Sequence, residues 1–349
     1  MYEKNILNEI IKYNEPITIE KFIEISLYSK NGYYKKSDVI GKKGDFITSP
    51  EISQLFGEIL GLFINDFWSS SIKQNFNLIE LGPGKGTLLL DILRVNNADD
   101  NFINNLNINL VEKNIKLIAE QKNLLKKNNI NLNKIRWLDD FKINSKNPII
   151  VLANEFFDCF PVRQFYKKKD KWNEKMVQFN NNEKYLQIKD RQIDDLKTLN
   201  LIKSYNPNDV LEISEAREKY FSKICKKIFS VGGSMIAIDY GYIKKPNNFT
   251  LQALFNNKKS NVLENIGYQD ISSLVDFDKL IKITKNYGLK IYLFNSQHDF
   301  FVKYGIKERY HKLSYKCSGE QKKIIKNGID RIIDKKNMGS LFKVLIITK

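Results

Sequence analysis

The feature that most constrains this chain is an apolar strand pattern that ends in an acid and runs into three alternating glycines. The segment ELGPGKGT begins at Glu80 and contains Gly82, Gly84 and Gly86, and a leucine-rich helical pattern follows it. Glycines at such a junction let the backbone adopt positive φ and let a ligand approach where a Cβ atom would collide. A dinucleotide site would need its third glycine at Thr87, and the P-loop spacing is also absent. The junction therefore predicts a ligand site of another kind.

The spacing that is present, G-x-G-x-G after an acidic strand end, is typical of S-adenosylmethionine-dependent methyltransferases, although short glycine turns also occur at ordinary strand-to-helix junctions. Two later strand ends carry side chains that suit an adenosine group. Glu112 can accept hydrogen bonds from both ribose hydroxyls. Trp137, which taken alone reads as a core aromatic, can lie on the adenine face while Asp139 reads the exocyclic amine. Together the three strand ends predict S-adenosyl-L-methionine as the cofactor.

From Asn77 onward, short β-branched apolar runs alternate with helical patterns, as in parallel strands joined by crossover helices. We predict strands at 77–82, 108–113, 135–140, 148–156, 234–241, 289–296 and 342–349. A helix with Ser214 as its N-cap is expected before the fifth strand. These elements predict an α/β fold, a Rossmann-like class I methyltransferase with a seven-stranded, mostly parallel sheet.

Two regions lie outside a minimal sheet of this kind. Residues 1–76 have a mostly helical pattern, in which Pro50 begins a helix with an apolar face, and we expect a helical N-terminal cap over the site. Residues 163–210 alternate apolar and polar side chains around turn signals, which predicts an inserted β-hairpin or meander that faces the substrate. The methyltransferase core is expected to span residues 77–349.

The fourth predicted strand ends in Asn154 and Glu155, and Asp158 follows three residues later. We expect this strand end to face the methyl group, with Asn154 belonging to both the cofactor site and the catalytic site. Two carboxylates here can hold a guanidinium by paired hydrogen bonds and take up its proton, which suits arginine as the acceptor. The alternative is that both acids cap the following turn. A nucleic-acid methyltransferase would carry an [ND]-P-P-[YFW] loop at this position, and that loop is absent.

The net charge of +17 comes from lysines spread along the whole chain, so no nucleic-acid partner is expected. The three cysteines and two histidines show no metal-ligand spacing, and we expect no metal site. No apolar run reaches the ~18 residues that cross a bilayer. Because the N-terminus also resembles neither a secretory signal nor a transit peptide, we expect a cytoplasmic protein without membrane insertion.

Several segments resemble the MidA-like methyltransferases, a family that includes the mitochondrial assembly factor that methylates an arginine on a core subunit of respiratory complex I. The matching segments are KGDFITSPEISQLFGE from Lys43, ELGPGKGT from Glu80, ANEFFDCFPVRQF from Ala153, GGSMIAIDYGY from Gly232, TLQA from Thr250 and LVDFDKL from Leu274. The resemblance implies a protein substrate, such as a complex I core subunit. It also implies that Asp45 and Glu51 lie over the cofactor on the substrate side, and that Asp239 and Tyr240 line the acceptor side.

One departure from the family follows TLQA. The family continues there with a histidine-containing basic stretch, whereas this chain has LFNNKKSNVLENIGYQDIS. A histidine that assists substrate binding is therefore not expected at this position. Methyl transfer is still expected without this histidine, because transfer from a sulfonium needs an aligned, deprotonated nucleophile and no acid. A non-catalytic protein that keeps the fold to bind a partner during assembly stays open as the alternative.

Overall fold

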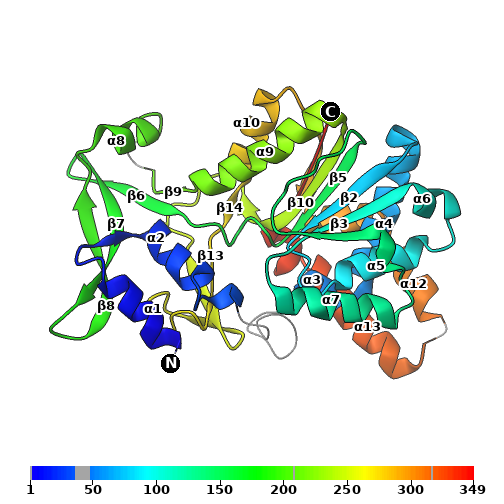
Figure 1. The fold of residues 1–349 in the computed structure, drawn as a ribbon, viewed down its shortest axis with the longest axis horizontal. Coiled ribbons are helices and arrows are strands. Elements are labelled where there is room, and N and C mark those ends of the chain that lie inside the picture. The colour runs from blue at the N-terminus through cyan, green and yellow to red at the C-terminus, as the bar shows by residue number, and fades with distance from the viewer. Residues whose placement is uncertain (1, 36–47, 207–208, 316) are drawn as a thin grey trace.

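A twisted mixed sheet that contains all seven predicted strands forms the centre of the fold (Figure 1). The structure is a computed structural model and describes residues 2–35, 48–206, 209–315 and 317–349. The seven strands are β2 (Phe76–Leu81), β3 (Leu106–Val111), β4 (Ile135–Leu138), β5 (Ile149–Asn154), β10 (Gly233–Tyr242), β15 (Lys290–Ser296) and β16 (Phe342–Thr348). Over the described residues, the sheet order is β15-β16-β10-β5-β2-β3-β4, and β14 (Val275–Asp276) pairs with the end of β10.

Strand direction brings the ends of the central strands together. β16 runs antiparallel to β10 and β15, whereas β4, β3, β2, β5 and β10 pair in parallel. The register places Glu80 of β2 between Leu110 of β3 and Leu152 of β5, and it places Asn154 beside Ile238 of β10. The carboxyl ends of neighbouring strands therefore meet at one edge. The predicted fold class, a Rossmann-like α/β methyltransferase fold, is confirmed.

Helices cover both faces of this sheet. On one face lie α4 (Gln54–Phe67), α5 (Thr87–Asn96), α7 (Ile115–Lys127), α11 (Gln297–Lys303), α12 (Ile306–Ser314) and α13 (Gly319–Ile333), with the short helices α6 (Asp100–Asn105) and α14 (Met338–Leu341) near its ends. On the other face lie α9 (Glu215–Val231) and α10 (Phe277–Asn286) (Figure 1). In β2, Leu78 joins the first layer, while Ile79 and Leu81 join the second. Burial on both faces explains why the central strands are continuous apolar runs.

Capping side chains set the ends of two predicted helices. Ser214 caps α9, and its hydroxyl accepts a hydrogen bond from the backbone N–H of Arg217 at 3.2 Å, as the sequence predicts. The single helix expected from Pro50 is interrupted at Ser53, whose backbone is extended. The interruption separates α3 (Ser49–Ile52) from α4, and the Ser53 hydroxyl caps the second helix.

The inserted segment is an antiparallel sheet, as predicted. Its strands are β6 (Arg163–Lys168), β7 (Lys171–Asn180), β8 (Tyr185–Gln192), β9 (Leu211–Ile213) and the N-terminal β1 (Ile17–Thr18), and α8 (Leu196–Ile202) lies between β8 and β9. The turn between β6 and β7 consists of Lys169 and Asp170, with φ of 48° and 61°. Positive φ at both positions is what the type I′ two-residue hairpin turn requires.

A second lobe forms around this inserted sheet. It includes α1 (Tyr2–Ile11), α2 (Ile19–Ile23), the π-helical turn η1 (Glu24–Tyr28) and a small sheet of β11 (Gln252–Phe255), β12 (Lys258–Ser260) and β13 (Asp270–Ser272). Ile6, Phe22, Val177, Ala253 and Ile271 share one buried cluster. We call residues 2–35, 163–213 and 250–272 the second lobe, which lies on the left of Figure 1.

The expected N-terminal cap, residues 1–76, is divided between the two parts of the molecule. Residues 2–35 pack into the second lobe, whereas α4 packs on α5 against the main sheet. We therefore propose that residues 48–76 belong with the core, and that the insertion at about 163–210 belongs with the second lobe.

Close packing between α4 and α5 predicts that Gly61 tolerates no larger side chain. A Cβ atom on Gly61 would lie 2.7 Å from Val95 Cγ1 and 2.9 Å from Ile92 Cα. Gly61→Val should lower the free energy of unfolding by about 1–3 kcal/mol or more, because overpacking displaces helix backbone. Urea unfolding measures the change. Gly319→Ala, with open space around its Cβ, is the control, and equal stability of both variants would contradict the packing.

Candidate active site

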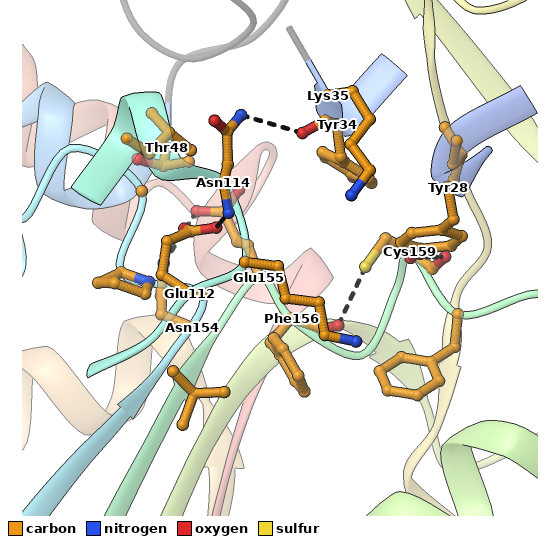
Figure 2. Close-up of a pocket in the computed structure, with 18 of the residues that line it drawn as sticks. Tyr28, Tyr34, Lys35, Thr48, Glu112, Asn114, Asn154, Glu155, Phe156 and Cys159 are labelled. Carbon is orange, nitrogen blue, oxygen red and sulfur yellow. Dashed lines mark hydrogen bonds between the residues drawn. The ribbon is translucent and has the colours of Figure 1, made fainter. Parts of the chain in front are cut away.

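A cavity of about 760 Å³ lies at the carboxyl ends of β2, β3, β4 and β5, where the core meets the second lobe (Figure 2). In open α/β sheets this edge is the usual place for a ligand. Its core wall includes Glu80, Gly82, Gly84, Glu112, Asp139, Asn154, Glu155 and Phe156. Its second-lobe wall includes Lys21, Glu24, Ile25, Leu27, Tyr28, Tyr34 and Lys35.

The glycine turn has the backbone that its sequence predicts. Gly82, Gly84 and Gly86 have φ of 61°, 53° and 85°. A Cβ atom on Gly82 would lie 3.2 Å from Phe156 Cδ2, and one on Gly86 would lie 3.3 Å from Gln121 Cγ. Gly82 and Gly84 line the cavity, whereas Gly86 begins α5 behind it. The turn therefore exposes backbone to a ligand at two of the three predicted positions.

Two buried oxygens at this edge have no hydrogen-bond partner among the described residues. They are Glu80 Oε2 and Asn154 Oδ1, and both residues line the cavity. Burial raises the pKa of Glu80 to about 8. Buried acceptors are normally paired, so these two are suited to donors on a bound molecule.

Of the residues predicted to bind the ribose and the adenine, Glu112 and Asp139 line the cavity and Trp137 does not. Glu112 lines the cavity, burial raises its pKa, and its Oε1 accepts from the Asn114 backbone N–H at 2.7 Å (Figure 2). Asp139 lines the cavity with an exposed side chain. Trp137 does not reach the cavity, because its indole N–H donates to Gln121 Oε1 at 2.8 Å and its ring packs in the core beside α7.

Glu155 stands in the left-handed region at the end of β5, with φ of 50°. Non-glycine residues seldom hold this conformation, which carries backbone strain for a side chain such as glutamate. Its Oε1 accepts from the Ser49 backbone N–H at 3.0 Å and from Asn154 Nδ2 at 3.3 Å. Burial is the main cause that raises the pKa of Glu155 to about 7, and the nearby carboxylate of Asp239 adds to it. The structure thus presents the Glu155 carboxyl group, with its raised pKa, to the cavity from the end of β5.

The other residues predicted on the acceptor side, Asp239, Asp158 and Tyr240, do not line the cavity. Asp239 Oδ2 accepts from the Phe157 backbone N–H at 2.8 Å, so Asp239 holds the turn from behind. Asp158 is buried outside the cavity lining, and burial and neighbouring carboxylates raise its pKa. Tyr240 packs on Phe342 with ring centroids 4.0 Å apart. Of the expected pair of acids, Glu155 lines the cavity and Asp158 does not.

Glu51 lies at the cavity, where its Oε1 accepts a hydrogen bond from the Thr87 hydroxyl at the start of α5. Asp45, expected beside it, lies outside the described residues. Sequence reasoning missed Tyr28 and Tyr34, which reach the cavity from the second lobe. No local pattern identifies them, since their place depends on packing between distant segments. Cys159, also missed, lies in the turn after β5 and was open to the same reasoning as Glu155.

Comparison with known proteins identifies similar chains over nearly the whole length. The Caenorhabditis elegans protein named "Protein arginine methyltransferase NDUFAF7 homolog, mitochondrial" is 31% identical over 361 residues, covering 96% of this chain and 82% of its own. The Homo sapiens protein arginine methyltransferase NDUFAF7, mitochondrial, is 30% identical and covers 95% and 80%. A Burkholderia thailandensis crystal structure with bound S-adenosyl-homocysteine has a TM-score of 0.84 at 21% identity, covering 100% and 92%. This last likeness confirms the fold.

The predicted cytoplasmic location is wrong by this comparison, because the relatives that cover the chain are named as mitochondrial proteins. Within the described ranges, no helix is both long enough and apolar enough to pass through a membrane.

The raised pKa of Glu80 predicts how the stability of the cofactor-free protein depends on pH. A carboxyl whose folded-state pKa is raised stabilises the fold below its unfolded pKa near 4.5, and this contribution is lost as pH rises through about 8. Glu80→Gln should therefore flatten the fall in unfolding free energy between pH 5 and 8, by an amount on the order of a few kcal/mol. Urea unfolding at both pH values tests this. The exposed Glu183→Gln should leave the wild-type slope, and an unchanged slope in Glu80→Gln would refute the assignment.

One remaining comparison, with a family profile, agrees with the sheet, the glycine turn and the acids at successive strand ends. A family profile described as "Putative S-adenosyl-L-methionine-dependent methyltransferase" matches residues 59–295, more than half of the chain. The chain therefore belongs to this family of S-adenosyl-L-methionine-dependent methyltransferases.

Proposed function

We propose that this enzyme is a protein arginine N-methyltransferase that acts on a subunit of respiratory complex I or its bacterial counterpart. Its NDUFAF7 relatives are named as protein arginine methyltransferases, and the MidA-like resemblance supplies the finer target. The observation that carries the proposal is Glu155, a carboxylate at the cavity end of β5 whose backbone is strained.

The residues at the strand ends fit S-adenosyl-L-methionine as cofactor. The unpartnered oxygens of Glu80 and Asn154 are suited to its ammonium and other donors, and the turn at Gly82 and Gly84 leaves room for close approach. Glu112 is suited to the ribose hydroxyls. When bound, this cofactor supplies a methyl group on a sulfonium, so that transfer forms an N–C bond as the C–S bond breaks.

Glu155 is assigned both orientation and proton transfer. An arginine side chain stays protonated in water, and nitrogen attacks a methyl group only as it gives up a proton. A carboxylate can hold the guanidinium by charge-assisted hydrogen bonds and take its proton at the same oxygen. With a pKa of about 7, Glu155 is ionised above neutrality and is still basic enough to accept that proton.

A protein acceptor is favoured over nucleic acid. The turn after β5 reads Asn154-Glu155-Phe156-Phe157 instead of the [ND]-P-P-[YFW] loop of nucleic-acid methyltransferases. Incubating the enzyme with labelled cofactor and isolated complex I subunits, followed by mass spectrometry, tests the target. Label on nucleic acid, or on no complex I arginine, would contradict it. If no methyl group is transferred to any acceptor, the alternative holds, in which the protein binds a partner without turnover.

Loss of Glu112 should weaken cofactor binding and leave the transfer step intact. Removing charge-assisted hydrogen bonds to a ribose diol costs roughly 1.5–3 kcal/mol, about a 10- to 150-fold loss of affinity. Calorimetry on Glu112→Ala measures it. Because Glu112 also accepts from the Asn114 backbone, Glu112→Gln is the matched control, which keeps an acceptor but removes the charge. Lower turnover at saturating cofactor with unchanged affinity would rule out the ribose role.

Glu155→Gln should bind cofactor nearly normally and transfer methyl roughly 100-fold more slowly, because a proton-transfer group is lost. Single-turnover methylation should rise with pH through about 7 in the wild type and lose that dependence in the variant. Asp158→Asn is the control, since it changes an acid of the same turn that does not line the cavity. If Asp158→Asn slows transfer and Glu155→Gln does not, the two roles are reversed.

A further inference from the structure

On the second-lobe wall, the side chain of Tyr28 is partly exposed at the cavity, whereas apolar residues just before it in the chain are buried. Leu27 is 0% exposed and Ile25 is 2% exposed, whereas Tyr28 is 42% exposed and lines the cavity. Figure 2 shows Tyr28 and Cys159 on the side of the view opposite Glu112 and Asn154. The ring therefore faces the cavity from across the proposed cofactor residues.

The position of this ring is fixed by contacts on two sides. The Tyr28 hydroxyl donates a hydrogen bond to the Cys159 carbonyl at 2.8 Å, which ties the second lobe to the turn after Glu155. The Tyr34 ring lies 5.6 Å away at a tilt of 35°, and the Tyr34 hydroxyl donates to Asp270 Oδ1 at 2.8 Å. Tyr28 also ends the π-helical turn η1, a local geometry that often occurs at functional sites. The wall is thus built before any ligand arrives.

We propose that Tyr28 is an acceptor-binding residue, and that the guanidinium of the substrate arginine stacks on its ring while Glu155 binds the guanidinium edge. This inference rests on the proposed function and adds the element that selects arginine. A guanidinium is planar and weakly hydrated, so an aromatic face and an in-plane carboxylate bind it on different sides. A lysine ammonium is compact and strongly hydrated, and it gains less from such a wall. The hydrogen bond to Cys159 sets the distance between the ring and the turn that carries Glu155.

The proposal assigns Tyr28 to the acceptor and not to the cofactor. The cofactor-side acids Glu80 and Glu112 lie on β2 and directly after β3, whereas Tyr28 comes from the second lobe and contacts the turn after β5. Loss of its ring should therefore change acceptor affinity and leave cofactor affinity unchanged.

Binding of two blocked peptides, Gly-Arg-Gly and Gly-Lys-Gly, to the protein saturated with S-adenosyl-homocysteine tests the proposal without catalysis. The wild type should prefer the arginine peptide. Tyr28→Leu should weaken that binding by about 10-fold and bring the two peptides close together in affinity. Tyr28→Phe, which keeps the ring but loses the bond to Cys159, should show a smaller loss. Tyr185→Leu, at a 49% exposed tyrosine of β8 outside the cavity lining, is the matched control and should behave as wild type.

Calorimetric titration of S-adenosyl-homocysteine on the same preparations separates the outcomes. Wild-type peptide affinity in Tyr28→Leu overturns the stacking role, and so does a loss of cofactor affinity with unchanged peptide preference. In either case, methyl transfer to arginine by the wild type would leave the proposed function standing. If the wild type neither prefers the arginine peptide nor methylates any arginine, the proposed function itself fails, and the role of Tyr28 fails with it.

Discussion

The turn on which the site depends is held by one buried carboxylate. Asp239 on β10 is 0% exposed, and its two oxygens accept hydrogen bonds from the backbone N–H groups of Phe156, Phe157 and Tyr240. A carboxyl group this deep is tolerated only when hydrogen bonds replace its water. The carboxyl group and the turn therefore stabilise each other. With the two amides after Glu155 fixed, the strained backbone of Glu155 is held, and its side chain reaches the cavity while Asp239 remains behind.

The same arrangement explains which site residues could be predicted. The apolar runs and the glycine turn identify the strands and the sheet edge, and parallel pairing then brings Glu80, Glu112 and Asn154 together. Side-chain direction is a separate matter, because adjacent residues of a strand point to opposite faces. Trp137 turns toward α7, and Asp158, beyond the end of β5, is carried out of the cavity lining by the turn. Spacing gives a residue's distance along the chain, but not the face it occupies once the turn has formed.

The second lobe could not be predicted as a unit for a different reason. Its sheet is completed by only two N-terminal residues, with Ile17 paired to Val177, and a Cβ atom on Gly267 would meet Ile6 at 2.1 Å. Neither contact leaves a periodic trace in a local window, because each depends on segments more than a hundred residues apart. A helical pattern in the first 76 residues was visible, but its division between α4 on the core and α1 and α2 on the lobe was not.

The position of residues 250–272 in the second lobe also explains why the chain can lack a histidine after TLQA. Asn256 and Asn257, with φ of 51° and 60°, form the turn of the β11–β12 hairpin. In the part of the chain that the structure describes, residues 250–272 do not line the cavity. The buried apolar side chains of residues 250–272 instead share a cluster with Ile25 and Leu27, which shortly precede Tyr28. The stretch supports the second-lobe wall from behind by apolar packing and by Asp270, which accepts from the Tyr34 hydroxyl. The polar residues of its hairpin turn, Asn256 and Asn257, can therefore change without changing what the cavity presents to an acceptor.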